Sequence, residues 1–171
     1  MNIVLLDADV IIDLHRLNLW KSLTKNNKIH VSSIIVSREV YYYEDAAGKR
    51  HIIDLSKEAG KSFVEISATI GQLSTITKEF EGLFEIDLHA GEKEALAILT
   101  TKKDMLFCTC DKAAMRALGF LGINHQGISF EKLLDRSGIK KKLEMKHSER
   151  QFRQFTQEGV AIRLAMSTIK I

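Results

Sequence analysis

Hydrophobic positions along the chain alternate between short, strand-sized runs and longer segments with helical spacing. The run from Ile3 to Leu6 is apolar throughout and ends at Asp7, which is the pattern of a strand covered on both faces in a parallel sheet. The run at residues 105–110 is also apolar, and it too ends at an acid, Asp111. Apolar residues at 10–25 recur instead at helical spacing. The chain therefore opens with a predicted strand and helix.

The rest of the chain continues this alternation. We predict strands at 29–35, 52–55, 63–66 and 105–110 and near Ile123, and helices at 68–80, 92–101, 112–118 and 130–136. We expect the strands at 52–55 and 63–66 to pair with each other, and Ser37 to cap a helix that carries Glu39, Tyr42 and Tyr43. Gly119 and Gly122 are read as helix stops. The order of elements predicts an α/β fold with a mainly parallel central sheet.

Residues after Gly138 differ in charge from the rest of the chain. Six basic residues stand against two acidic ones between Lys140 and Arg153, a local excess of +4, whereas the whole chain carries +3. We predict a main domain at 1–138 and a basic, helical C-terminal extension at 139–171, with a helix break at Gly159. The extension either packs back on the domain or serves a partner, and its basic part is either a solvated face or a phosphate-contacting surface.

Composition restricts the class of protein. The 171 residues, 45% of them hydrophobic, suit one compact domain of ordinary size. No apolar run approaches the roughly 20 residues that span a bilayer, and the first residues do not resemble a secretory signal. We therefore expect a cytoplasmic protein without a membrane segment. Cys108 and Cys110 both lie within one apolar run, so we expect buried thiols without a mutual disulfide.

Two acids that end strands suggest where chemistry takes place. In open parallel sheets, ligands bind at the carboxyl ends of the strands, so we expect Asp7 and Asp111 to share a pocket. Asp9 follows Asp7 closely, and Glu92 opens a helix whose N-terminus favours a carboxylate. Several carboxylates in one site raise one another's pKa unless a cation offsets them. Mg²⁺ or Mn²⁺ provides that offset through oxygen ligands and can activate water for phosphodiester hydrolysis.

Each acid also has a simpler interpretation. Asp7 and Asp111 can serve as helix N-caps, and Asp13 is expected on the helix surface. Glu39 falls near the end of the second predicted strand, where Glu44 is its rival.

Other residues carry weaker signals. Glu94 is expected to be an ordinary helix-favouring acid. The six histidines show no metal-binding pair, so we expect solvated or hydrogen-bonded rings, with His89 beside Glu92 as the exception.

Four segments together resemble the PIN-domain family of small metal-dependent ribonucleases, which includes the toxins of toxin–antitoxin pairs. The similar segments are Leu5–Leu14, Val36–Val40, Gly91–Leu99 and Thr109–Arg116. The resemblance covers residues 1–137 and implies a PIN-like three-layer α/β/α fold. By the same resemblance, the catalytic acids would be Asp7, Glu39, Glu92 and Asp111.

The resemblance implies a nuclease that hydrolyses single-stranded RNA with Mg²⁺ or Mn²⁺. The metal ligands would be Asp7, Glu92 and Asp111, with Asp9 beside them. We further expect substrate to be held by Arg116 and, outside the segments that carry the resemblance, by Lys140, Lys141 and Lys142 of the extension. The expected partners are RNA, an antitoxin protein and a second copy of the chain in a homodimer.

Two other functions remain open at this point. The segment Val4–Val10 also fits the strand end of haloacid-dehalogenase-like phosphatases, with Asp7 as nucleophile and Asp9 as acid and base. The second alternative is a non-catalytic PIN-like module that binds RNA or protein.

Overall fold

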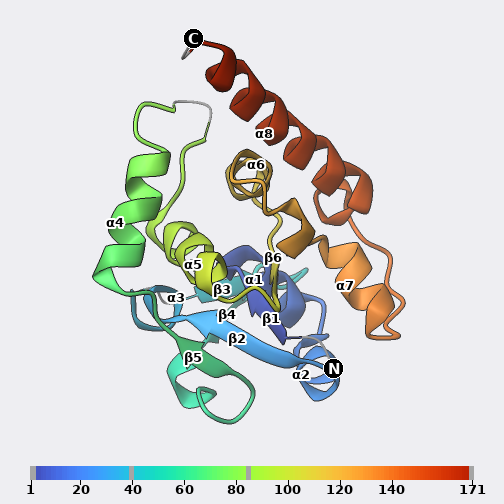
Figure 1. The fold of residues 1–171 in the computed structure, drawn as a ribbon. Helices are drawn as coiled ribbons and strands as arrows, with labels where there is room; N and C mark the ends of the chain where they lie inside the picture. Colours follow the sequence, from blue (N-terminus) through green and yellow to red (C-terminus); the bar gives the residue numbers. More distant parts are fainter. Residues whose placement is uncertain (1–2, 39–40, 84–85, 170–171) are drawn as a thin grey trace.

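The computed structural model describes residues 3–38, 41–83 and 86–169 and has an α/β fold (Figure 1). Its strands are β1 (Ile3–Leu6), β2 (Lys28–Ser32), β3 (Tyr41–Glu44), β4 (Arg50–Ile53), β5 (Val64–Ile66), β6 (Met105–Cys108) and β7 (Gly127–Ile128). Its helices are α1 (Ala8–Arg16), α2 (Trp20–Asn26), α3 (Ser33–Arg38), α4 (Ile70–Glu79), α5 (Ala90–Thr101), α6 (Lys112–Phe120), α7 (Phe130–Arg136) and α8 (Glu149–Ile169). Short 3-10 turns are η1 (Leu55–Lys57), η2 (Asn124–Gln126) and η3 (Met145–His147).

The central sheet has five strands in the order β5-β2-β1-β6-β7, and each described pair is parallel. The predicted α/β class with a mainly parallel sheet is therefore confirmed. Leu6, the last residue of β1, pairs with Val31 of β2 and with Cys108 of β6. Because β1 and β6 end level with each other, the residues that follow them emerge at the same edge of the sheet.

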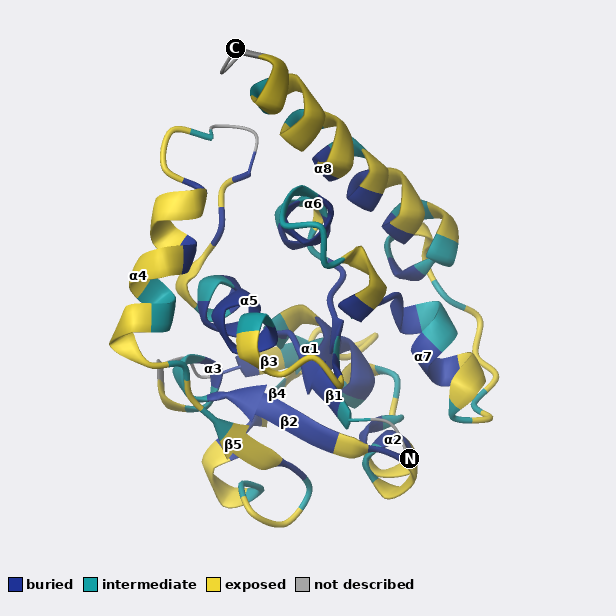
Figure 2. Cartoon of the chain, in the orientation of Figure 1, coloured by how far each residue is buried: buried dark blue, intermediate teal, exposed yellow. Residues whose placement is uncertain are grey.

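Two hydrophobic cores cover the two faces of the sheet, which completes the predicted three layers. Val4 and Leu6 of β1 point into a core shared with α1, α2 and α7. Leu5 points the other way, into a core shared with α4, α5, α6 and α8. All three β1 side chains are completely buried, as the unbroken apolar run predicts. Figure 2 shows this burial as a dark central sheet between helices whose outer faces are exposed.

The predicted helix at 10–25 is two helices. Asn18 adopts a positive φ of 58° between α1 and α2, a conformation that asparagine tolerates better than most residues. This single residue interrupts a continuous apolar pattern, which is why the spacing alone predicted one helix.

The segment after β2 also differs from the prediction. The strand ends at Ser32 and α3 starts at Ser33, so the expected helix from Ser37 through Tyr43 is wrong. Tyr42 and Tyr43 instead lie in β3, which forms an antiparallel hairpin with β4. The strands expected at 52–55 and 63–66 exist as β4 and β5, but β5 pairs with β2 rather than with β4.

Near the C-terminus, β7 forms at Gly127–Ile128 rather than at Ile123. The helix α8 runs unbroken through Gly159 and lies against α6, as the red and ochre helices of Figure 1 show. A Cβ atom on Gly159 would lie 1.9 Å from the carbonyl oxygen of Arg116, and one on Gly119 would lie 1.9 Å from that of Thr156. The two glycines therefore permit backbone contact between the helices and do not break them.

The extension thus packs back on the sheet layers, because Phe152 and Phe155 of α8 belong to the second core. None of the helices in the described ranges is both long and apolar enough to cross a membrane.

Gly159→Ala tests the close contact of α6 with α8. The added methyl group has no room, so we expect the free energy of unfolding to fall by about 1–3 kcal/mol in urea denaturation. Gly71→Ala in α4 is the matched control, since its Cβ would come no closer than 3.9 Å to Thr69. We expect that control to gain up to about 1 kcal/mol from helix propensity. Equal effects of both substitutions would contradict the tight packing.

Candidate functional site

Asp7 is held at the end of β1 by three contacts. Its backbone N–H continues the sheet by donating to Cys108 O (3.1 Å). Its side chain caps α1, with Oδ1 accepting from Ala8 N (2.8 Å), and Oδ2 accepts from the hydroxyl of Thr109 (2.7 Å). Asp7 is only 5% exposed. The carboxylate is therefore fixed at the edge of the sheet and is almost completely buried.

Asp111 lies beside it because β6 ends level with β1. Its Oδ1 caps α6 by accepting from Ala114 N (2.8 Å), and its backbone N–H donates to Thr109 Oγ1 (3.0 Å). The fully buried Thr109 hydroxyl thus accepts from Asp111 and donates to Asp7. Both acids are N-caps, as the simple interpretation predicts, and both also contact Thr109, so the capping role is compatible with a shared site. Sequence reasoning did not assign Thr109 a role, although it stands two positions before Asp111.

Glu92 reaches the same place from the start of α5. Its Oε2 accepts from His89 N (2.8 Å), and its Oε1 lies 3.8 Å from His89 Nδ1. The side chain is buried, whereas the ring of His89 is 85% exposed. The capping contact therefore fixes the Glu92 carboxylate at the N-terminus of the helix, where the helix dipole favours negative charge.

These acids line one cavity of about 560 Å³. Its described lining residues are Asp7, Ala8, Asp9, Ile34, Ile35, Tyr41, His89, Ala90, Gly91, Glu92 and Asp111. The structure thus brings together Asp7, Glu92 and Asp111, as predicted, and adds the exposed Asp9. The sequence analysis expected Asp7 and Asp111 to share a pocket from their strand ends and expected Asp9 and Glu92 near them, and all four line this cavity.

The carboxylates oppose one another's ionisation. The pKa of Asp7 is raised to about 6, chiefly by burial and also by the charges of Asp9 and Asp111, against the hydrogen bonds from Thr109 and Ala8 that lower it. The pKa of Glu92 is raised to about 7, first by burial and then by the charges of Asp7 and Asp111. A cation between the carboxylates would relieve both effects.

The acidic cavity suits a hard divalent cation, since its donors are carboxylate oxygens. In the described part of the chain, no three of the acids that line it have ligand atoms all within 4.8 Å of one another. An ion there would consequently be held partly through water, as Mg²⁺ commonly is.

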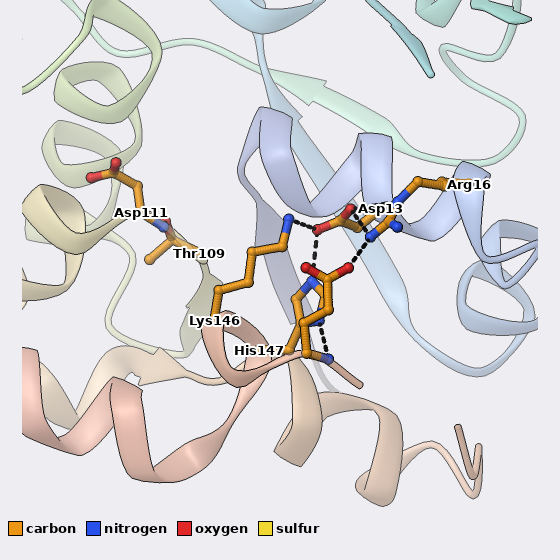
Figure 3. A network of polar contacts seen from close by, with 7 residues as sticks. Asp13, Arg16, Thr109, Asp111, Lys146 and His147 are labelled. Carbon is orange, nitrogen blue, oxygen red and sulfur yellow. Dashed lines mark hydrogen bonds and ion pairs between the residues drawn. The ribbon is translucent and has the colours of Figure 1, made fainter. Parts of the chain in front are cut away.

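A tighter group of possible ligands lies nearby in Asp13, Cys110 and His147. Here the prediction that Asp13 is a surface residue is wrong, since Asp13 is only 3% exposed. Lys146 Nζ and His147 Nε2 both lie 2.7 Å from Asp13 Oδ2, and Arg16 pairs with Oδ1 (Figure 3). Burial would raise the pKa of Asp13, but these three contacts lower it.

This second group fits a metal ion poorly. Glu144 N donates to His147 Nδ1 (3.2 Å), so the proton of the neutral ring is on Nε2, which points at Asp13. Metal binding through Nε2 needs that nitrogen unprotonated, and the Asp13 charge is already paired. Burial raises the pKa of the Cys110 thiol, which keeps it protonated. Cys108 and Cys110 are free and buried, as predicted.

The remaining predicted acids lie elsewhere. Glu39 falls outside the described residues. Its rival Glu44 is exposed at the end of β3, where it pairs with Arg50 (3.0 Å). Glu94 is buried and accepts from Ser33 Oγ (2.9 Å) and Ile34 N (2.8 Å), so it fixes the start of α3.

The predicted substrate-binding residues do not line the acidic cavity. Arg116 pairs with Glu158 of α8 at 2.8 Å, and its guanidinium lies 4.7 Å from the centre of the Phe155 ring. Arg116 therefore helps to hold α8 on α6. Lys140, Lys141 and Lys142 are exposed on the segment between α7 and η3.

Comparisons of this chain with family models, with curated proteins and with solved structures give no match.

Two glutamates of α5 provide a test of the electrostatic conflict. The pKa of Glu92 is raised from 4.5 to about 7, so its contribution to stability is present below about pH 4.5 and is lost as the pH rises through about 7. Without divalent cations, Glu92→Gln should therefore increase the free energy of unfolding at pH 8 by about 1–2 kcal/mol and have little effect near pH 4.5.

Glu94→Gln is the matched comparison in the same helix. The Glu94 carboxylate accepts three hydrogen bonds, from Ser33, Ile34 and Ala68. In the glutamine variant, an amide N–H group replaces one acceptor oxygen and faces one of these donors, so at least one hydrogen bond is lost. We expect it to lower the free energy of unfolding at pH 8 by about 1–3 kcal/mol. If Glu92→Gln were as destabilising as Glu94→Gln in chemical denaturation, the conflict between the acids would be refuted.

Proposed function

We propose that this protein is a divalent-metal-dependent hydrolase of phosphodiester bonds and that its substrate is single-stranded RNA. The observation that carries the proposal is the cavity in which Asp7, Asp9, Glu92 and Asp111 converge at the carboxyl edge of a parallel sheet. Ligand sites of open α/β sheets lie at this edge. The choice of RNA among phosphodiesters rests on the resemblance to the PIN-domain ribonucleases.

The chain's own residues would divide the work in the following way. Asp7 and Asp111 are fixed by Thr109 and by helix N-caps, so they would hold Mg²⁺ or Mn²⁺ without rearrangement. Glu92 would complete the set from α5, and the exposed Asp9 would act from the rim. When bound, the ion supplies a lowered pKa for water and stabilises negative charge on the phosphoryl oxygens.

The raised pKa values of Asp7 and Glu92 have a consequence for this chemistry. Near neutral pH, Glu92 and to a smaller extent Asp7 are partly protonated when no cation is bound, so metal binding releases protons and strengthens as the pH rises. Activity is therefore proposed to increase from pH 6 to pH 8.

The biological setting remains part of the same proposal. The resemblance suggests a cytoplasmic ribonuclease of a toxin–antitoxin pair that acts as a homodimer, with an antitoxin protein as partner. Lys140, Lys141 and Lys142 are exposed and are proposed to contact RNA outside the cavity.

Cleavage of a labelled single-stranded RNA tests the proposal. We expect cutting with Mn²⁺ or Mg²⁺, none with chelator, and a loss of at least about 100-fold in Asp111→Asn. Asparagine is as good an N-cap as aspartate, so the fold of α6 is retained. Asp104→Asn, exposed just before β6 at the opposite edge of the sheet, should cut like wild type.

A phosphomonoester assay separates the rival enzyme class. Turnover of a phosphomonoester that is lost in Asp7→Asn, with RNA left intact, would replace the nuclease proposal by the phosphatase one. RNA binding without metal-dependent turnover of either substrate would instead support a binding module.

A further inference from the structure

Lys146 approaches the acidic cavity from the C-terminal segment. It lies in η3, and its ammonium is 2.7 Å from Asp13 Oδ2. Asp13 stands four residues after Asp9 on α1, and four residues correspond to about 6 Å along a helix. In Figure 3 the ammonium lies between Asp13 and the segment that carries Thr109 and Asp111. The positive charge is therefore close enough to Asp9, a carboxylate that lines the cavity, to act on it electrostatically.

The cavity needs such a charge if its ligand is a polyanion. Its four acids carry up to four negative charges, and one divalent cation leaves an excess of two. Among the described residues that line the cavity there is no lysine or arginine, and the one basic side chain is His89. An RNA phosphate approaching the site would thus meet net repulsion unless a cation stands at the rim.

The ion pair with Asp13 leaves the Lys146 ammonium able to donate further hydrogen bonds. Arg16 already contacts Asp13 Oδ1 through Nε (3.1 Å) and Nη2 (2.8 Å), and His147 contacts Oδ2. An ammonium has three donors, and the described contacts of Lys146 give it one acceptor residue. Its side chain is 42% exposed. Lys146 can therefore keep its ion pair and still present donors to solvent.

We propose that Lys146 is a substrate-positioning residue, whose ammonium contacts an RNA phosphate next to the one that lies over the acidic cavity. Lysine suits this role as a mobile point charge on a flexible stem. Asp13 and His147 fix the segment from which that stem projects. The inference rests on the proposed function, since it takes RNA as the substrate of the acidic site.

The test compares three lysine variants of the full chain. Lys146→Met removes the charge, Lys146→Arg keeps it, and Lys103→Met removes an exposed charge just before β6, at the opposite edge of the sheet. Binding of a fluorescently labelled single-stranded RNA is measured by anisotropy over a NaCl series, with Ca²⁺ in place of Mg²⁺. Cleavage kinetics are measured separately with Mn²⁺.

We expect Lys146→Met to weaken RNA binding about 5–10-fold and to reduce the slope of log Kd against log salt by about 0.7, the value for one phosphate contact on a single strand. In cleavage, KM should rise by a similar factor while kcat changes less than about 3-fold. Lys146→Arg and Lys103→Met should bind within about 2-fold of wild type.

A purely structural role makes a different prediction. If Lys146 served only to pair with Asp13, the variant would act through the buried carboxylate that has lost one of its cationic partners, and Asp13→Asn combined with Lys146→Met would restore RNA binding. We expect no restoration, even where the double variant recovers the thermal unfolding midpoint that Lys146→Met loses.

The outcomes are distinguishable from those of the proposed function. Restoration in the double variant, or binding by Lys146→Met that matches Lys103→Met, would overturn the role of Lys146 while wild type still cuts RNA. Wild-type protein that neither binds nor cuts RNA would overturn the proposed function and this inference together.

Discussion

Repulsion between carboxylates held at one edge of the sheet is the constraint on which the candidate site depends. Parallel pairing of β1 with β6 places Asp7 and Asp111 side by side, and the start of α5 adds Glu92. Each of these carboxylates accepts a hydrogen bond from a backbone N–H at a helix start, which partly offsets the repulsion between them. The two hydrophobic cores hold the strands in register and so stabilise the fold against the remaining repulsion between the carboxylates. This arrangement explains why the site favours protons when no cation is bound.

Much of this arrangement could be predicted because it depends on local patterns. The apolar runs that end at Asp7 and Asp111 located two neighbouring strands and the edge at which they end. Helices α4 and α7 agree with their predicted ranges to within two residues. These elements have a regular hydrophobic period and clear start and stop signals, so their structure is specified by residues close in sequence.

The features that could not be predicted depend on single residues or on distant contacts. A positive φ at Asn18 divides one apolar stretch into two helices, and Gly159 looks like a helix break although it allows α8 to approach α6. Asp13 is separated from His147 by 134 positions. A charge in the middle of a helix is normally solvated, and its burial becomes apparent only when the residues that pair with it are seen in space. The basic excess of the extension was visible in the sequence, but the place where Lys146 contacts α1 was not.

The close packing of α8 on α6 also affects how the chain folds during synthesis. Translation produces α6, whose N-cap is Asp111, before it produces Phe152 and Phe155, which cover the apolar face of α6. Domains fold on the ribosome in the order in which their residues emerge. When every acid of the cavity has been synthesised, the nascent chain therefore still lacks α8, which packs on the helix that Asp111 caps. The helix that Asp111 caps therefore gains its cover from α8 only once the residues up to Gly159 have left the ribosomal exit tunnel.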